Sequence, residues 1–335
     1  MRWGVVTTVA EPPALLAAFV AHYAQLGAGA IRLYFDRPDP EAAALIAQVT
    51  GVEVIDADAA FYSEELGLRG KPAQLNRKQR FNADHAMRTM EVDWLLHVDA
   101  DEFLAAEDFA AELAAQPPDV DSLHIANGER AWIAGQAPQT IFDGVLRWPV
   151  AGPRRRIRRI LGAEVAEFTD RGFCGHLWGK SVTRTGRGLK LGLHKPRRDP
   201  PAHQVAAKAA KLCHFDGLTR RHWVAKLMRY AELGMYAEPK GPHRCRHAQV
   251  AHVKNAGSDP AAAFALHDMI RVIPEDVAEG WREAGLIEAM PCDPAGAARA
   301  LFGDAVDLSP EAFDAVLSQK ETRAPGDARL IADPS

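Results

Sequence analysis

The sequence predicts an α/β fold built on a parallel, doubly wound sheet, and three observations support it. Segments of strand and helix character alternate over the first hundred residues. The run from Trp94 to Val98 is apolar, as expected for a strand covered on both faces. That strand leads directly into three carboxylates, Asp99, Asp101 and Glu102. Such residues at the carboxyl end of a strand lie where α/β sheets bind ligands.

The elements follow from local patterns. Short runs rich in β-branched and aromatic residues indicate strands, and apolar residues spaced three or four apart indicate helices that end at glycine. Strands are expected at 2–9, 31–35, 52–55, 94–98 and 122–125. Helices are expected at 13–26, 41–49, 76–90, 219–233, 260–273, 274–284 and 310–318. Residues 61–72 are expected to form a loop. The β-α-β order implies right-handed crossovers between parallel strands.

The composition of the chain limits the classes of protein to which it can belong. The chain has 335 residues, a net charge of −4 and four cysteines without a C-x-x-C pair. The charge is too mild to make nucleic acid the main partner, and no apolar run approaches the length that crosses a bilayer. The start of the chain lacks a signal-peptide pattern because Pro12 and Pro13 interrupt it. We therefore expect a cytoplasmic enzyme with reduced thiols.

The Asp-x-Asp triplet occurs three times, so two copies serve as controls. Asp119/Asp121 precede a strand, which is the wrong end for a ligand, whereas Asp56/Asp58 follow a short strand and stay candidates. Only Asp99/Asp101 follow a long apolar strand and continue into Glu-Phe-Leu. Two such carboxylates can hold a divalent cation against phosphate oxygens. The alternative is that they cap a helix or shape a turn.

Two further strands end in polar residues, at Thr7/Thr8 and at Asp36. Because parallel strands end at one edge of a sheet, these side chains and Asp99/Asp101 are expected along the same edge. A ligand there would meet hydroxyls, a carboxylate and a metal-binding pair. Asp and Thr also cap helices at strand ends, so the agreement of three strands supports a site without proving one.

The order of these features resembles that of GT-A glycosyltransferases, close to the family 2-like and family 92-like groups. The supporting segments are 5–11 (VVTTVAE), 22–27 (HYAQLG), 33–36 (LYFD), 77–80 (RKQR) and 93–103 (DWLLHVDADEF). The likeness is patchier at 179–181 and 214–216. Ala10 and Arg37 stand where family 2-like members often have Asn, and no Gln-x-x-Arg-Trp motif of processive synthases is present.

The resemblance implies a Rossmann-like nucleotide-diphospho-sugar transferase fold with a mixed sheet and a helical C-terminal extension. It implies a catalytic domain at 1–255, divided near residue 104 into nucleotide and acceptor halves, a helical extension at 256–320 and a flexible tail at 321–335. It further implies a metal-dependent hexosyltransferase that uses a nucleotide sugar, with UDP-sugar favoured, and a glycan or glycolipid acceptor.

The resemblance also assigns roles to residues. Asp101 would bind Mn²⁺ or Mg²⁺ directly, Asp99 would contact the ribose or a metal-bound water, and a distant histidine, His214 or alternatively His194, would be the third ligand. The implied nucleotide-binding residues are Thr7, Thr8, Glu11, Asp36, Gln79, Arg80, Asp99 and Lys180. The implied catalytic carboxylates are Glu129 and Asp216, with Asp143 and Asp170 as rivals for the general base.

A run of five arginines between Arg154 and Arg159 follows Gly152-Pro153 and is expected to be a mobile surface loop. Three functions are open: binding an acidic acceptor, binding the donor diphosphate, or peripheral contact with the inner face of the membrane. Nucleic acid is not expected because the run holds no aromatic residue.

Three other functions stay open for the whole chain. A metal-dependent nucleotidyltransferase could share the α/β plan, although no glycine-rich phosphate loop occurs early in the sequence. A hydrolase could use the same carboxylates. A catalytically silent protein could bind nucleotide or glycan without turnover.

Overall fold

The computed structural model describes residues 1–238 and 244–323. The chain forms two compact units that interleave in sequence. The first unit comprises 1–127, 178–212 and 292–306; the second comprises 128–177, 213–291 and the segment that begins at 307. The domains predicted from the sequence, 1–255, 256–320 and 321–335, are consecutive segments, and that division stays a prediction. Most of the expected tail at 321–335 lies outside the described residues.

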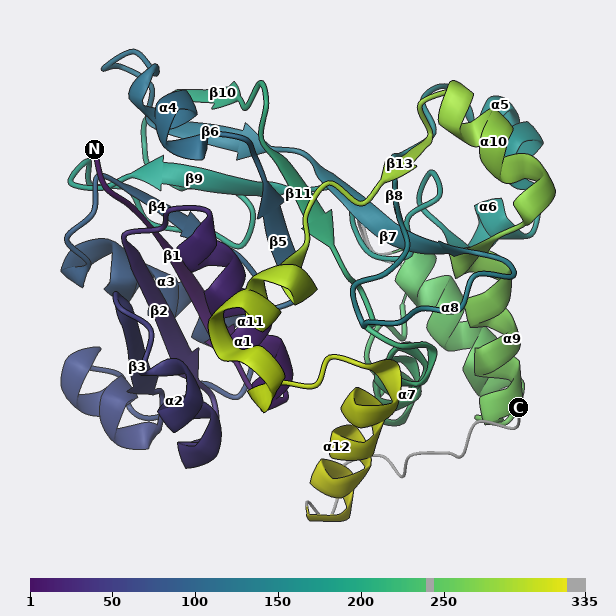
Figure 1. Cartoon of the computed structure of the whole chain (residues 1–335), viewed down its shortest axis with the longest axis horizontal. Helices are drawn as coiled ribbons and strands as arrows, with labels where there is room; N and C mark the ends of the chain where they lie inside the picture. The colour runs from purple at the N-terminus through teal and green to yellow at the C-terminus, as the bar shows by residue number, and fades with distance from the viewer. Residues whose placement is uncertain (239–243, 324–335) are drawn as a thin grey trace. The chain divides into compact units, whose positions relative to one another are not determined.

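Four parallel strands form one half of the sheet in the first unit. They are β1 (Trp3–Val9), β2 (Ala30–Phe35), β3 (Val52–Asp56) and β4 (Trp94–His97), in the order β4-β1-β2-β3 (Figure 1). In this register Val6 lies opposite Arg32 on one side and His97 on the other. The carboxyl ends of β1, β2 and β4 are therefore adjacent. The predicted parallel sheet is confirmed for these strands.

The other half of the sheet reverses direction. β9 (Lys180–Arg184) runs antiparallel to both β4 and β6 (Ser122–Ile125), and β10 (Gln204–Ala206) pairs in parallel with β6. The sheet has seven strands in the order β10-β6-β9-β4-β1-β2-β3. The α/β fold with a mixed sheet is thus confirmed. Pairing with β9 places Lys180 beside the acidic end of β4.

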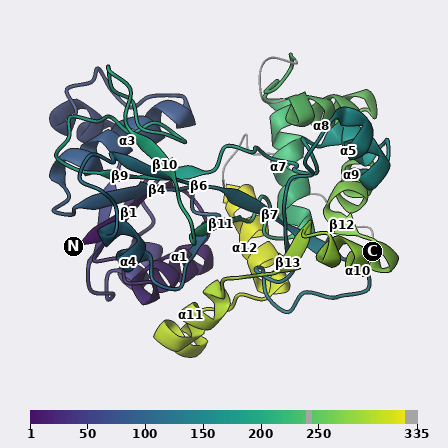
Figure 2. The same cartoon turned by 90° about the horizontal axis from the view of Figure 1, so that it is seen from above.

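Helices cover both faces of this sheet, as expected for a doubly wound fold. Figure 2 shows α3 (Leu75–Thr89) on one side of β1 and β4, and α1 (Pro13–Gln25) and α4 (Phe109–Ala114) on the other. Two further helices, α2 (Pro40–Ile46) and α11 (Pro294–Phe302), pack on α1. Asp39 caps α2 through Oδ1, which accepts the Ala42 N–H at 3.0 Å.

Two segments expected as loops are helical. Residues 61–65 form a π-helical turn, η1 (Phe61–Glu65), because Asp58 accepts the Phe61 N–H at 2.8 Å and Phe61 and Tyr62 are buried. The arginine run forms α5 (Arg154–Leu161), anchored by buried Leu161. The prediction of a loop there is wrong, because the segment is a helix whose last residue, Leu161, is buried. The five arginines made the run look fully exposed.

The second unit combines a small mixed sheet with helices. Its strands are β7 (Asn127–Ile133, which starts at the unit boundary), β8 (Val145–Arg147), β11 (from Lys211 to His214, likewise spanning a boundary), β12 (Val272–Ile273) and β13 (Ile287–Ala289). β8 runs antiparallel to β7 and β13, and β12 pairs in parallel with β7. Residues 272–273, expected to end a helix, thus belong to a strand.

The helices of the second unit gather around an apolar cluster. They are α6 (Val165–Phe168), α7 (Arg220–Glu232), α8 (Arg244–Asn255), α9 (Pro260–Arg271), α10 (Glu275–Glu283) and α12 (Pro310–Arg323). α7, α8 and α9 pack on one another through Trp223, Leu227, Val250 and Phe264 (Figure 2). Four predicted helices are confirmed. Within the described ranges no helix combines the length and apolar character that membrane crossing requires.

Candidate functional site

A buried lysine organises the acidic end of β4. Lys180 Nζ lies 2.7 Å from Oδ2 of Asp99 and 3.1 Å from Oε2 of Glu102, the first residue of β5 (Glu102–Ala105). The same Glu102 oxygen accepts the Asp99 N–H at 2.8 Å. Burial opposes the charge on Lys180, but the two carboxylates outweigh it and raise the pKa of the lysine. The loop after β4 is therefore fixed by an ion-pair network.

Gln79 joins this network from α3. Its amide Nε2 donates to Oδ1 of Asp99, so the two Asp99 oxygens are held by side chains from different segments. The Asp99 side chain is still one-third exposed, whereas Lys180 and Glu102 are buried. The structure thus brings together three predicted residues, Gln79, Asp99 and Lys180, while the Asp99 side chain stays partly exposed to solvent.

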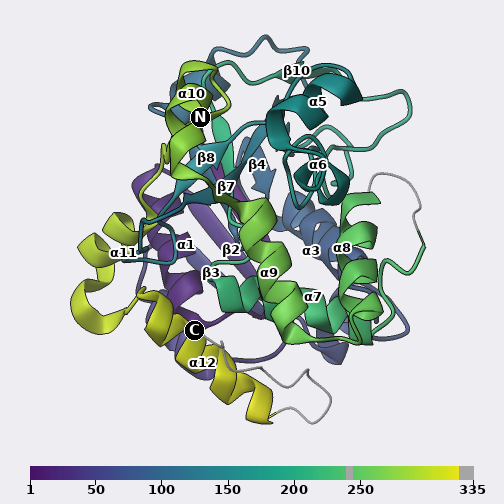
Figure 3. The ribbon, with the colours of Figure 1, turned by 90° about the vertical axis from the view of Figure 1, so that its right-hand side faces the viewer.

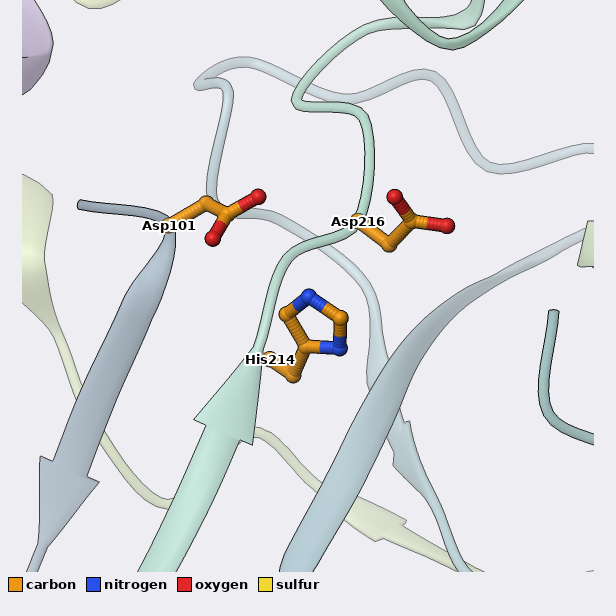
Figure 4. A group of neighbouring side chains, drawn as sticks. All are labelled: Asp101, His214 and Asp216. Carbon is orange, nitrogen blue, oxygen red and sulfur yellow. The ribbon is translucent and has the colours of Figure 1, made fainter. Parts of the chain in front are cut away.

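Two more carboxylates approach the same end of the sheet. Asp101 lies in the turn before β5 and is partly exposed (Figure 4). Glu11 follows β1 and its carboxylate accepts the Ala10 N–H. Burial, together with the negative charges of Asp101 and Asp99, raises the pKa of Glu11 to about 7. Negative charge is therefore concentrated here beyond what Lys180 balances.

The end of β2 carries a second ion-pair cluster. Asp36 Oδ1 lies 2.8 Å from Lys78 Nζ and 2.9 Å from Lys71 Nζ. Burial would raise the pKa of Asp36, but hydrogen bonds and charge from Lys78 and Lys71 lower it overall. Asp36 is thus an ionised carboxylate flanked by two ammonium groups, an arrangement with both acceptors and donors for a polar ligand.

The two threonine hydroxyls at the end of β1, those of Thr7 and Thr8, differ in their hydrogen bonding. Thr8 Oγ1 accepts a hydrogen bond from Asn82 Nδ2 at 2.9 Å, and Asn82 Oδ1 accepts one from Tyr62 at 3.0 Å. Thr7 is buried, and its hydroxyl has no hydrogen-bond partner among the described residues. Arg80 donates to the Asn76 carbonyl within α3, at 3.2 Å, and no contact places it with the Asp99 network.

The Asp-x-Asp copy at 119–121 has a structural role. Asp121 is buried, 2.6 Å from Arg198, and accepts the His203 N–H at 2.9 Å. In the copy at 56–58, Asp58 caps the π-helical turn at Phe61. Of the three copies, Asp99/Asp101 follow a central strand at its carboxyl end, where Gln79 and Lys180 hold Asp99.

His194 lies in the first unit, in the segment that follows β9. Its Nδ1 is 3.0 Å from the Gly179 carbonyl, and its own carbonyl accepts from Ser181 Oγ at 2.7 Å. Gly179 has φ 54°, and a Cβ there would collide with the Ile125 carbonyl oxygen. The Gly179-Lys180-Ser181 segment is therefore fixed on both sides of Lys180.

The remaining predicted residues belong to the second unit. His214 ends β11, and Asp216 lies in the loop that follows it (Figure 4). The His214 ring stacks on His176, with centroids 5.4 Å apart. Asp216 is buried and contacts Arg246 at 2.6 Å and Lys226 at 2.8 Å. Despite burial, these cations lower the pKa of Asp216 well below its usual range.

Glu129 on β7 is also a buried ion-pair partner. It lies 3.0 Å from Arg147 and accepts the N–H groups of Cys174 and Gly175, each at 2.8 Å. Burial opposes ionisation, but Arg271 and Arg147 lower the pKa of Glu129. The rivals differ: Asp143 accepts hydrogen bonds from Thr140, and burial raises the pKa of Asp170. No role as a general base follows from these contacts.

Sequence reasoning assigned no role to Glu102, and it missed Lys71, Lys78 and Asn82 as members of the site. Glu102 had a signal, since it directly follows the Asp-x-Asp triplet. Lys78 and Asn82 also had one, because they lie one turn apart on the same helix as Gln79. Lys71 had none, because it comes from a segment expected to be an irregular loop.

The donor set in the first unit fits a hard divalent cation. Carboxylate oxygens are the ligands that Mg²⁺ and Mn²⁺ prefer. A bound cation would offset the negative charges of Asp101 and Asp99, which add to burial in raising the Glu11 pKa. Asp101 and Asp99, both partly exposed, are the carboxylates suited to the ion. Lys180 is suited to fixing Asp99 rather than to touching a ligand, because it is buried.

Comparisons with known proteins give remote likenesses only. No protein-family model matches the chain, and a search of curated proteins finds no match. Among solved structures, residues 1–349 of S. aureus TarS align with a TM-score of 0.33 and 14% identity, covering 96% of this chain and 84% of that chain. TarS 1–349 in complex with UDP-GlcNAc aligns with the same TM-score and 13% identity, over 96% and 85%. A galactosyltransferase, LgtC, in complex with donor and acceptor sugar analogs aligns with a TM-score of 0.25 and 12% identity, over 54% and 57%.

Proposed function

We propose that the protein is a metal-dependent glycosyltransferase that transfers a sugar from a nucleotide-sugar donor to a glycan or glycolipid. The observation that carries the proposal is the network of Asp99 with Gln79 and Lys180 at the carboxyl end of β4. It holds Asp99, whose side chain is one-third exposed, in place beside a second, partly exposed carboxylate at Asp101. Open α/β sheets bind nucleotides at this edge.

Several of the predicted residues then have a part in donor binding. Asp101, with Asp99, would hold Mn²⁺ or Mg²⁺, and the ion would neutralise the leaving diphosphate. Lys180 and Glu102 keep Asp99 in place, which limits reorganisation during the reaction. Asp36 with its two lysines would hold the base, and Thr8 with Asn82 would line the nucleotide pocket. His214 as a third metal ligand is a role that the sequence resemblance implies.

A thermal-shift panel tests donor binding. The protein is mixed with UDP-, GDP-, CMP- or dTDP-sugars, each with and without Mn²⁺. One nucleotide sugar is expected to raise the melting temperature only when Mn²⁺ is present. Asp101→Asn should abolish that shift, while the matched control Asp119→Asn, from another Asp-x-Asp copy, should preserve it. A flat response across the panel contradicts the proposal.

Product analysis with the responding donor separates the alternatives. A glycosyltransferase releases the nucleotide of the donor, a nucleoside diphosphate or, from a CMP-sugar, CMP, in step with sugar transfer to an alkyl glycoside acceptor. A hydrolase releases it to the same extent without acceptor, and a nucleotidyltransferase instead releases pyrophosphate from a nucleoside triphosphate and a sugar phosphate. Stabilisation without any release identifies a silent binder.

A further inference from the structure

The helix α5 carries a dense positive charge that has no part in the site proposed at the carboxyl end of β4. Its five arginines, at positions 154, 155, 156, 158 and 159, are all exposed. None of their side chains forms an ion pair or hydrogen bond with another residue in the part of the chain that the structure describes. The nearest acidic residues along the chain, Glu164 and Glu167, are exposed and leave the 154–168 segment with a net positive charge.

Helix stability does not explain this sequence. Arg154 and Arg155 lie in the first turn, where the helix dipole disfavours cations, and each faces another arginine four residues on. Pro153 begins the helix without a side-chain cap. Leu161 is buried and Ile157 is half-buried, so packing holds α5 in spite of the charges. A helix that keeps mutually repelling charges in solvent is suited to an anionic partner.

The distribution of the arginines indicates the shape of that partner. With about 100° between successive residues, the five side chains cover an arc of roughly 200°, and the isoleucines and Leu161 fill the rest. A single phosphate or carboxylate is bound by donors that converge on it, whereas these guanidinium groups diverge from a convex surface. A broad layer of negative charge matches them better.

We propose that α5 binds the anionic headgroups of a lipid bilayer and holds the protein at a membrane surface. Basic helices bind acidic lipids by long-range attraction without deep insertion, and α5 exposes no large apolar side chain that would insert. Figure 3 shows α5 beside α6, and the two helices pack together, so the charged surface belongs to a folded part of the second unit. A nucleic acid fits less well because no aromatic residue for base stacking lies in the run. This inference is independent of the proposed function.

Vesicle co-sedimentation of the intact chain tests it. Vesicles of phosphatidylcholine alone are compared with vesicles that also contain phosphatidylglycerol, at low and at physiological salt. We expect binding only to the acidic vesicles, weakening as salt screens the charges. Arg155→Gln/Arg159→Gln should weaken binding by roughly 25-fold, or fivefold for each arginine. Lys208→Gln/Lys254→Gln removes the same charge from two other exposed positions and should leave binding within about twofold.

Each other outcome overturns the proposal. Absence of binding to acidic vesicles at low salt excludes a lipid surface as the partner. An equal loss in the Lys208/Lys254 control shows that overall charge, not α5, drives binding. Complete displacement from vesicles by stoichiometric single-stranded RNA reassigns α5 to nucleic acid. Melting curves of both double variants, expected to match the parent, confirm that the variants are folded.

Discussion

Lys180 Nζ lies 2.7 Å from Asp99 Oδ2, although the two residues are 81 positions apart in the sequence. The contact exists because β9 runs antiparallel to β4 and begins where β4 ends. Glu102 shares the same ammonium group at 3.1 Å and is fully buried. One lysine therefore joins two strands and sets the position of the acidic loop between β4 and β5.

Lys180→Met is predicted to lower the free energy of unfolding by about 3–5 kcal/mol, because it removes the positive charge that faces the buried Glu102 carboxylate. Urea denaturation measures the change. Adding Glu102→Gln should restore part of the loss, since the uncompensated charge is then removed. Lys190→Met, at an exposed lysine beyond β9, is the control and should change stability by less than about 0.5 kcal/mol. Equal effects of the two lysine variants would show that the network is not stabilising.

Asp36→Asn is predicted to affect ligand binding more than stability. Its ion pairs with Lys71 and Lys78 are partly exposed, so their loss should cost no more than about 1 kcal/mol. The thermal shift given by the responding nucleotide sugar should nevertheless disappear if Asp36 binds the base. Asp56→Asn, at the end of the neighbouring strand β3, is the matched control and should retain the shift. A retained shift in Asp36→Asn would remove Asp36 from the site.

His22 is predicted to make the protein less stable in acid. Burial lowers its pKa to about 4, from an ordinary value of 6.5, while its Nε2 lies 2.8 Å from the Leu104 carbonyl. Between these two values the unfolded state binds a proton that the folded state does not, so stability falls as pH drops from 6.5 to 4. This one histidine accounts for up to about 3 kcal/mol of that loss.

The variant His22→Gln isolates that contribution, because glutamine can still donate to the Leu104 carbonyl but does not titrate. The free energy of unfolding, measured at several pH values by urea denaturation, should fall less steeply in the variant. Identical pH slopes in the two proteins would mean that the His22 pKa is not lowered by folding.

Glu129→Gln is predicted to destabilise the protein by about 3–5 kcal/mol, because buried Arg147 loses its charged partner and buried Arg271 loses one of its two. A general base gives a different result: turnover is lost while the unfolding curve is unchanged. Measuring both properties on the same preparation distinguishes the two roles. Glu164→Gln, at an exposed glutamate in the same unit, should change neither.

Gly179→Ala is predicted to be more damaging than Gly186→Ala, although both glycines have positive φ. The strained backbone costs about 1–2 kcal/mol at either position. At Gly179 the new methyl group also meets the Ile125 carbonyl, whereas the space at Gly186 is open. Chemical denaturation should therefore rank parent above Gly186→Ala above Gly179→Ala, and the reverse order of the two variants would contradict the described backbone.

The first half of the fold could be read from the sequence because its signals are local. Apolar runs, helix spacing and terminal glycines placed β1, β2, β3 and β4 to within about two residues. The Asp99/Asp101 motif stood out for the same reason, since strand and carboxylates are adjacent in the chain. The helix α5 was not predicted because its arginines suggest a fully exposed segment, although Leu161 is buried. The turn η1 was not predicted because a π-helical turn has no sequence pattern of its own.

The sequence by itself determined the α/β class, the parallel strands and the acidic end of β4, because these depend on residues close together in the chain. Only the tertiary structure decided which side chains meet there. The pairing of β9 with β4 supplies Lys180, and helix α3 supplies Gln79. These contacts form when strands pair and helices pack between segments that are distant in the sequence. No local sequence pattern therefore predicts which side chains will meet.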